Sequence, residues 1–334
     1  MATITDVARL ARVSPATVSR VLNGTTDVSP ERAERVRQAV AELQYQPFSP
    51  ARALRRQLTD VWAVIVADIE NPFFTSVVRG IEDGAREFGY RVLLCNSDED
   101  VGKEAGYIDV AVGERVGGVV ISVASTRQSD LAPLLRLGVP VVAVDRRPVG
   151  HLVDSVLVDN RLGARQATAH LIENGARRVA CITGPKRLST ANERLAGYKD
   201  ALAAAGRRFD ESLVLREDFR QAGGYDAVRA LTSGRPRAHP DALFVANNQM
   251  TVGALQALQQ QDLDVPGDVK VVGFDDAPWA TLTRPQLTVV AQPTYDIGRT
   301  AAELLATARA AKGGPREVVL VPKLVVRESS GRPG

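Results

Sequence analysis

Several aromatic and polar residues lie where apolar, strand-like runs of the sequence end. Asp145 and Arg146 come directly after Val141–Val144, and Asp275 follows a similar run. Aromatic rings stack on the apolar faces of sugars, while carboxylates, amides and guanidinium groups bind hydroxyls at fixed angles. Ligands of open α/β sheets bind beyond the carboxyl ends of the strands, which predicts one small-molecule site here. Its predicted residues are Phe73, Phe74, Asp145, Arg146, Arg194, Phe219, Asn247, Asp275 and Gln292.

The charged members of this set indicate what kind of ligand fits. Asp145 and Asp275 balance Arg146 and Arg194, so we expect a site that is neutral overall. A phosphate without a compensating cation would be costly in such a site, whereas a neutral polyol would not. Other roles stay open for some members, because Phe74 could face the core, Phe219 could cover an interface between lobes, and Asn247 could simply cap a helix.

The sequence lacks the local motifs of the common enzyme classes. It has no glycine-rich phosphate loop and no His-Glu-x-x-His metal motif. The three histidines, at positions 151, 170 and 239, have no spaced nucleophile or carboxylate, and Cys95 and Cys181 are far apart in apolar runs. We therefore expect no enzyme, no metal and no cofactor. Buried thiols, the absence of a secretion signal and the absence of a long apolar run predict a cytoplasmic, nucleoid-associated protein without a membrane span.

The first 46 residues predict three short helices. One covers Thr5–Ala11, with Leu10 among its apolar positions; the second has Ser14 as its cap and Pro15 at its first position and runs to Leu22. Ser29-Pro30 repeats this start signal for the third helix. About three residues separate the first two helices, which predicts a helix-turn-helix. Residues 1–59 hold nine Arg against five acidic residues, whereas the rest of the chain has one acidic residue in excess, so the basic excess lies in this segment.

From Val61 the pattern changes to alternating strands and helices, which predicts parallel sheets with helices on both faces. With 334 residues, 45% of them apolar, the chain can build more than one core. The expected strands lie near 61–66, 91–95, 117–123, 139–144, 154–158, 178–183, 242–246, 269–274 and 287–291. The expected helices lie near 72–89, 161–174, 191–205, 223–232 and 249–261.

The segment Thr5–Gly24 resembles, nearly residue for residue, the headpiece of the LacI/GalR family of bacterial repressors. The resemblance covers essentially the whole chain, because it continues through Asn71–Phe74, 158–160, 194–198, 271–276, 291–293 and 324–329. It implies an all-α helix-turn-helix headpiece (1–46), a hinge helix or linker (47–59) and a periplasmic-binding-protein-like effector domain (60–334). That domain would be a double lobe of doubly wound parallel sheets, with an N-lobe near 60–159 and 292–320 and a C-lobe near 160–291 and 321–330.

This resemblance implies a sequence-specific transcription repressor, and the residue types of the second helix agree with it. Small residues at the start of a helix let it sit deep in the major groove, where Arg20 can make a bidentate contact to guanine. Pro15 and Ala16 offer apolar contact to thymine methyls, and hydroxyls can fix the register on phosphates. The expected DNA contacts are Thr5, Ser14, Pro15, Ala16, Thr17, Ser19, Arg20 and Asn23, together with Leu54 and Arg55 of the hinge.

The hinge, residues 49–56, is implied to fold only on DNA, where Leu54 would wedge between base pairs and kink the duplex. The alternative is that Leu54 packs between domains. Phe48 stands where the family usually has a small polar residue, and Pro50 lies in the first turn. Both depart from the family pattern, and Phe48 leaves the path of the chain into this helix open.

The nine predicted site residues resemble, type for type, the site of ribose-binding proteins. They imply ribose or a related pentose as the effector. The alternative is a purine or nucleoside, but the related purine-responsive repressor type has an aromatic residue beside the carboxylate where this chain has Arg146. A homodimer on a near-palindromic operator is expected, because one headpiece reads only a half-site. The last eight residues show no heptads, so we expect no coiled-coil tail. Rival hypotheses are a sugar-binding protein without DNA activity and a sugar-processing enzyme.

Overall fold

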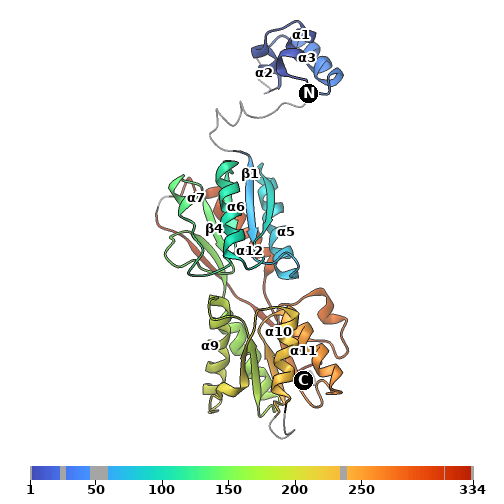
Figure 1. Ribbon diagram of the computed structural model, residues 1–334, viewed down its shortest axis with the longest axis vertical. Coiled ribbons are helices and arrows are strands. Elements are labelled where there is room, and N and C mark those ends of the chain that lie inside the picture. The colour runs from blue at the N-terminus through green and yellow to red at the C-terminus, as the bar shows by residue number, and fades with distance from the viewer. Residues whose placement is uncertain (1, 23–27, 46–58, 234–238, 312, 332–334) are drawn as a thin grey trace. The chain divides into compact units, whose positions relative to one another are not determined.

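The computed structural model describes residues 2–22, 28–45, 59–233, 239–311 and 313–331. It consists of two compact units, Met1–Thr59 and Asp60–Gly334 (Figure 1). The predicted DNA contacts Asn23, Leu54 and Arg55 lie outside the described residues, as do Phe48 and Pro50.

The described part of the first unit contains helices α1 (Ile4–Ala11), α2 (Pro15–Leu22) and α3 (Pro30–Glu42). Helix α1 begins one residue earlier than expected, because Thr3 and Asp6 form a reciprocal capping box at its start. At the start of α2 the Thr17 amide donates to Ser14 Oγ at 3.2 Å, as the cap prediction requires. The buried core is made of small side chains, whereas Leu10 is 43% exposed, so it does not share the buried side of α1 with the other apolar residues of this helix. The core residues are Val7, Ala8, Ala11, Val18, Val36 and Ala39.

The second unit contains two six-stranded sheets, one in each lobe, which Figure 1 shows end to end. The sheet of the first lobe, the N-lobe, has the order β11-β5-β4-β3-β1-β2 and is parallel throughout. Its strands are β1 (Val61–Val66), β2 (Arg91–Asn96), β3 (Gly118–Ile121), β4 (Val141–Val144), β5 (Asp154–Val158) and β11 (Glu317–Leu320). The second sheet, in the C-lobe, has the order β12-β10-β9-β8-β6-β7, with β12 antiparallel to β10. Its strands are β6 (Val179–Thr183), β7 (Val214–Arg216), β8 (Ala242–Val245), β9 (Lys270–Phe274), β10 (Thr288–Ala291) and β12 (Lys323–Val325).

Helices cover both faces of the N-lobe sheet. Trp62 and Val64 of β1 belong to one core, which packs under α5 and α12, whereas Ala63 and Ile65 belong to a second core under α6 and α7. This division follows from the strand geometry, since successive side chains point to opposite faces. The helices of the N-lobe are α5 (Pro72–Glu87), α6 (Val101–Gly113), α7 (Ala132–Arg136) and α12 (Thr294–Thr307). Those of the C-lobe are α8 (Asn160–Glu173), α9 (Ser189–Ala204), α10 (Gln221–Leu231) and α11 (Asn248–Gln260), with the short 3₁₀ segments Glu211–Leu213 and Pro278–Thr281.

The chain passes between the lobes three times: at Asp159, at Gln292-Pro293 and at Val321-Pro322 (Figure 1). The nine expected strands and five expected helices of this unit are present, with ends that agree or shift by one or two residues. The sequence-based expectation omitted α6, α7, α12, β7, β11 and β12. Three of these are strands of only three or four residues, and α6 contains three glycines, which lower helix propensity.

Candidate functional site

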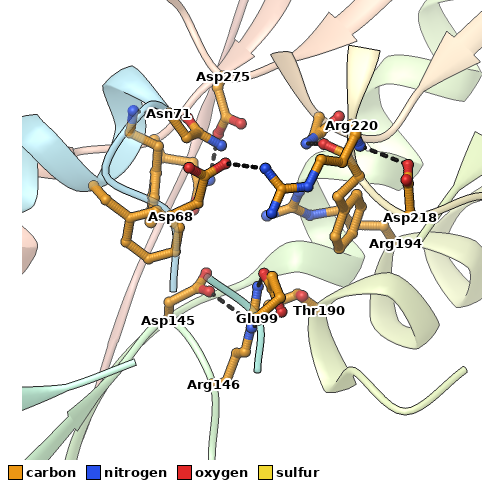
Figure 2. Close-up of a pocket in the computed structure, with 15 residues that line it drawn as sticks. Asp68, Asn71, Glu99, Asp145, Arg146, Thr190, Arg194, Asp218, Arg220 and Asp275 are labelled. Carbon is orange, nitrogen blue, oxygen red and sulfur yellow. Dashed lines mark hydrogen bonds and ion pairs between the residues drawn. The ribbon is translucent and has the colours of Figure 1, made fainter. Parts of the chain in front are cut away.

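A pocket between the two lobes collects residues from both sheets (Figure 2). Its lining residues follow the carboxyl ends of strands β1, β2, β4, β6, β7, β8, β9 and β10, as the binding rule for open α/β sheets requires. The pocket encloses about 470 Å³ of empty space, counting its open mouth. All nine residues predicted from the sequence line it. The other lining residues are Asp68, Asn71, Glu99, Thr190, Asp218 and Arg220.

On the N-lobe side, a buried ion-pair cluster surrounds Arg146. Its Nη1 and Nη2 donate to the two carboxylate oxygens of Glu99 at 2.8 and 2.6 Å, and Nη1 also donates to the Val123 carbonyl. Arg146 Nε lies 3.1 Å from Asp145 Oδ2. Burial disfavours the charge, but Glu99 and Asp145 outweigh that cost and raise the pKa of the Arg146 guanidinium. Arg146 is therefore a fixed cation.

On the C-lobe side, Arg194 is held in a comparable way by polar and aromatic groups. Its Nε donates to Asn160 Oδ1 at 2.7 Å, its Nη1 donates to the Ala246 carbonyl at 2.6 Å, and its guanidinium lies 3.8 Å from the centroid of the Phe274 ring. Gln292 Nε2 donates to Asp275 Oδ1 at 2.5 Å. Because Gln292 lies on a crossover between the lobes, the Asp275 carboxylate is connected directly to a segment that any change in lobe arrangement must move.

The two aspartates that end strands β4 and β9 share an unusual backbone and electrostatic setting. Asp145 and Asp275 have φ values of 67° and 77°, in the left-handed region that non-glycine residues rarely adopt. Burial raises the pKa of both carboxyls, and Arg146 and Arg194 act against that rise. Strained backbone that holds buried carboxylates is a feature of functional sites.

Three aromatic side chains give the pocket its apolar surfaces. Phe73 and Phe74 pack edge to face at 4.9 Å between ring centroids, and both belong to the N-lobe core while lining the pocket. The ring of Phe219 lies against Gly184, where a Cβ would fall 2.3 Å from the ring. Gly184 therefore leaves the room that Phe219 occupies. Phe219 itself has a φ of 66°, a rare value for a bulky residue.

The amides at the pocket serve two purposes. Asn247 Oδ1 caps α11 by accepting from the Met250 amide, and its Nδ2 donates to the Phe219 carbonyl. The capping alternative for Asn247 is thus realised together with its place in the pocket lining. Asn71 caps α5 and also accepts a hydrogen bond from Asn248 Nδ2 at 2.8 Å, which joins the two lobes.

The expectation that the pocket is electrically neutral was wrong. Its lining holds five carboxylates but three guanidinium groups, because Asp68, Glu99, Asp218 and Arg220 add to the four charges that the sequence analysis counted. Asp68 and Glu99 follow β1 and β2, so the strand-end rule could have found them. Asp218 and Arg220 flank the predicted Phe219. The excess of carboxylates makes the pocket even less suited to an anion than a neutral one would be.

In the first unit, the expected DNA contacts within the described residues are Thr5 in α1 and residues along α2, from its cap Ser14 to Arg20 in its last turn. Thr5, Ser14, Pro15, Ala16 and Arg20 are exposed, and Thr17 and Ser19 are half-buried. Ser14 Oγ lies 3.0 Å from Thr17 Oγ1, in addition to capping the helix, so part of its bonding capacity is used locally.

Other possible sites are absent from the described part of the chain. Cys95 and Cys181 are free and buried, as expected. In the ranges that the structure describes, there is no group of three or more His, Cys, Asp or Glu side chains that could hold a metal ion. No described helix combines the length and the apolar character needed to cross a membrane.

Both units of the chain match known protein families. Residues 3–47 match the family of bacterial regulatory proteins of the lacI type, and residues 168–330 match the periplasmic binding protein-like domain. The ribose operon repressor of Halalkalibacterium halodurans is 37% identical over 331 residues, which cover 99% of this chain and 97% of that protein. The chain belongs to the LacI family. It is a DNA-binding transcriptional repressor of that family and not an enzyme.

Two further relatives show the range of this family. The transcriptional repressor PurR of Aliivibrio fischeri is 36% identical over 332 residues, covering 98% of each chain. Among solved structures, the Lac repressor dimer bound to operator and the anti-inducer ONPF matches with a TM-score of 0.84 at 27% identity, covering 99% of each chain. The α/β double lobe and the helical headpiece that the sequence predicted are confirmed by this match.

Proposed function

We propose that this LacI-family repressor binds its operator as a homodimer and responds to ribose or a closely related sugar held in the pocket between the lobes. The observation that carries the proposal is the composition of the pocket: three aromatic rings, two fixed guanidinium groups, buried carboxylates and amides, all at strand ends. This combination suits a small ring with many hydroxyls.

Two buried polar atoms of the lining support a hydroxyl-bearing ligand. Within the described residues, Arg146 Nε and Gln292 Oε1 make no hydrogen bond, although both are shielded from solvent. Arg146 Nε is close to Asp145 without hydrogen-bond geometry. Leaving a buried donor or acceptor unsatisfied costs about 1–3 kcal/mol. A sugar hydroxyl can accept a hydrogen bond from Arg146 Nε or donate one to the neighbouring Asp145, and a hydroxyl can donate to Gln292 Oε1. Binding of a sugar would therefore recover this cost.

The charge of the lining favours a free sugar over a phosphorylated one. Two more carboxylates than guanidinium groups line the pocket, and the guanidinium groups of Arg146 and Arg194 are already engaged by protein acceptors. A phosphate would add negative charge without a free cation to meet it. The ribose operon repressor among the relatives agrees with a sugar ligand, since its name refers to a sugar.

The DNA-reading part of the proposal rests on the first unit. Pro15 and Ala16 are exposed at the start of α2, where small side chains allow close approach to a major groove. We assign Arg20 to guanine recognition and the exposed or half-buried hydroxyls of Thr5, Ser14, Thr17 and Ser19 to phosphates. Dimerisation follows from the two-fold symmetry of a near-palindromic operator, and the related Lac repressor structure is described as a dimer on its operator.

The coupling between the two functions would run through the crossovers between the lobes. Gln292 lies on one crossover and bonds Asp275, so a ligand at Asp275 would favour one arrangement of the lobes. To regulate, the effector must bind one state more tightly by roughly 1–3 kcal/mol. We propose that the sugar weakens operator binding, so that its presence releases the genes that the repressor controls.

A ligand panel tests the effector. Ribose, other pentoses, hexoses, purines and nucleosides would each be added to the purified protein, with melting temperature and titration calorimetry as readouts. Ribose should raise the melting temperature and lower operator affinity, and by reciprocity operator DNA should lower ribose affinity by the same factor. A rise with a purine alone would overturn the sugar assignment while leaving the repressor assignment intact.

A purine or nucleoside is the second candidate, favoured by the 36% identity to PurR over nearly the whole chain. The pocket geometry speaks against it. At the position beside Asp145, the side chain is Arg146, bonded on its outer edge to Glu99 and buried in the N-lobe wall. At this position the pocket offers polar donors and acceptors rather than an aromatic face for a base to stack on, and its aromatic faces are those of Phe73, Phe74 and Phe219.

A further inference from the structure

Arg220 differs from the other two arginines of the pocket in its position. It follows β7 in the C-lobe and reaches to carboxylates of the N-lobe, as Figure 2 shows for Asp68. Its Nη2 donates to Asp98 Oδ1 at 2.6 Å, and its Nη1 lies 3.9 Å from Asp68 Oδ2. The side chains of Arg220 and Asp98 are 39% and 40% exposed, whereas Arg146 is 4% exposed. Arg220 therefore crosses the pocket at its outer, solvent-facing end.

Arg220 and Asp98 form an ion pair that bridges the two lobes, and each of these residues is fixed by contacts within its own lobe. The Arg220 amide donates to Asp218 Oδ1 at 2.9 Å, and the preceding carbonyl, that of Phe219, accepts from Asn247 Nδ2 at 2.8 Å. On the other side, Asp98 has a φ of 55° and is held by Lys103 Nζ at 3.1 Å. Since backbone and partners are set on each side, the guanidinium has a defined place across the mouth.

Further contacts join the lobes around the same pocket. Asn248 Nδ2 donates to Asn71 Oδ1 at 2.8 Å, and the Ser189 amide donates to Thr126 Oγ1 at 3.2 Å. These contacts involve short or buried groups that leave little room for adjustment. Arg220, by contrast, is a long and partly exposed side chain, and its removal would open the mouth while leaving those contacts in place.

We propose that Arg220 is a specificity-determining residue that bars the mouth of the pocket and limits the effector to a single sugar ring. The proposal rests on the proposed function of the pocket as a sugar site. An effector that carries a bulky substituent would have to displace the guanidinium from Asp98 and Asp68. A single ring would fit beneath it, and the bridge would slow its escape.

The test compares Arg220→Ala and Asp98→Asn with the wild-type protein, and uses Arg161→Ala as the matched control. Asparagine tolerates the left-handed backbone of position 98. Arg161 pairs with Asp200 within the C-lobe, away from the pocket, so its variant also loses one exposed Arg–Asp pair. The probes are ribose and ribose derivatives with a benzyl group at O1 or at O5, with dissociation constants from calorimetry.

For Arg220→Ala we expect the preference for ribose over at least one benzyl derivative to shrink by about tenfold. Ribose itself should bind two- to fivefold more weakly, roughly the effect of losing an exposed ion pair. Asp98→Asn should shift the preference in the same direction but less, because Asp68 remains as a partner. Arg161→Ala should match the wild type.

Hydrogen exchange gives a readout that needs no ligand. Amides of residues 97–100 and 217–221 should exchange faster in Arg220→Ala than in Arg161→Ala. Unchanged exchange in these segments, or an unchanged preference for ribose in a folded Arg220→Ala protein, would overturn the proposal. Failure of the wild-type protein to bind any sugar would instead count against the proposed function, and the exchange comparison would still decide whether Arg220 closes the mouth.

Discussion

The two units of this repressor place their polar residues in opposite environments. In the headpiece, five of the residues assigned to DNA, from Thr5 to Arg20, are exposed on a three-helix surface. In the pocket, Asp145, Arg146, Arg194 and Asp275 are each less than a tenth exposed and are held by protein partners. Exposed basic and polar groups suit the phosphate backbone of DNA, because basic groups that neutralise phosphates release the counterions of the duplex. A neutral sugar has no net charge to attract, so its recognition depends on hydrogen bonds in a buried site.

The cores of the two units differ in the same sense. Among the described residues of the headpiece, the fully buried core consists of valine and alanine, whereas each lobe of the larger unit buries aromatic and long aliphatic side chains. A small unit buries a smaller fraction of its surface and is correspondingly less stable. The comparison of the two units therefore predicts that a change in salt, in pH or in a single residue will alter either operator binding or sugar binding and leave the other nearly unchanged.

Salt should separate the two functions most strongly. If the dimer contacts about 6–10 phosphates, operator affinity should fall by roughly 10³-fold or more between 50 and 200 mM salt. Ribose affinity should change by less than about twofold over the same range, because the pocket charges are buried and paired. Fluorescence anisotropy with labelled operator and calorimetry with ribose measure the two. A parallel fall of both affinities would contradict the predicted difference in salt dependence between operator binding and ribose binding.

Arg20→Ala should abolish most of the specific operator binding. A bidentate contact to guanine contributes about 1–3 kcal/mol, and a dimer makes it twice, so the expected loss is about 100-fold or more. Affinity for ribose should stay at the wild-type value. The control is Arg37→Ala, which removes an equal charge from an exposed position of α3. Competition with scrambled DNA distinguishes the two variants, since only Arg20→Ala should reduce the preference for operator; equal loss in both would refute base reading by Arg20.

Asp275→Asn should weaken ribose binding by about 10- to 100-fold, the effect of losing hydrogen bonds to a charged group. Asparagine keeps the left-handed backbone at this position. Operator affinity without sugar should be unaffected. Asp262→Asn is a matched control, because Asp262 also has a positive φ but is exposed and far from the lining residues. A similar ribose affinity in both variants would show that Asp275 does not take part in ribose binding.

The sequence predicted the parts of this architecture that local patterns determine. Apolar runs located the central strands, and the Ser14-Pro15 start signal located α2 at its correct first residue. The strand-end rule then brought most of the nine residues to one pocket, because it depends on where each strand stops, although Phe219 follows β7, a strand that the sequence analysis omitted. Helix α12, which the sequence analysis omitted, does have a helical pattern, since Ile297, Ala301 and Leu305 repeat at helical spacing and are buried.

The electrostatic partners could not be predicted in the same way. Glu99 meets Arg146 across 47 residues of sequence, and Arg220 meets Asp98 across 122. No local periodicity specifies such pairs, because they depend on which strands become neighbours and on the arrangement of the lobes. For this reason the sequence analysis found the residues that line the pocket but miscounted its charge.

The pH dependence should be the smallest of the expected effects. Burial raises the pKa of Asp145 and Asp275, so these carboxyls take up protons at a higher pH than exposed aspartates. A carboxylate accepts hydroxyl hydrogen bonds best when ionised, so binding favours the deprotonated form, and ribose affinity should fall as pH falls through the raised pKa values. This loss should begin above the pH range in which an exposed aspartate titrates, and it should amount to a few fold. Asp275→Asn should flatten part of this profile, because one of the two titrating groups is gone.

The headpiece sequence contains no histidine, and Thr3 lowers the pKa of Asp6 by hydrogen bonding, so that carboxyl stays ionised over the pH range in which ribose affinity falls. Operator affinity without sugar should therefore be nearly constant over the same pH values, and a profile that follows the ribose curve would show that the pocket and the headpiece do not titrate independently.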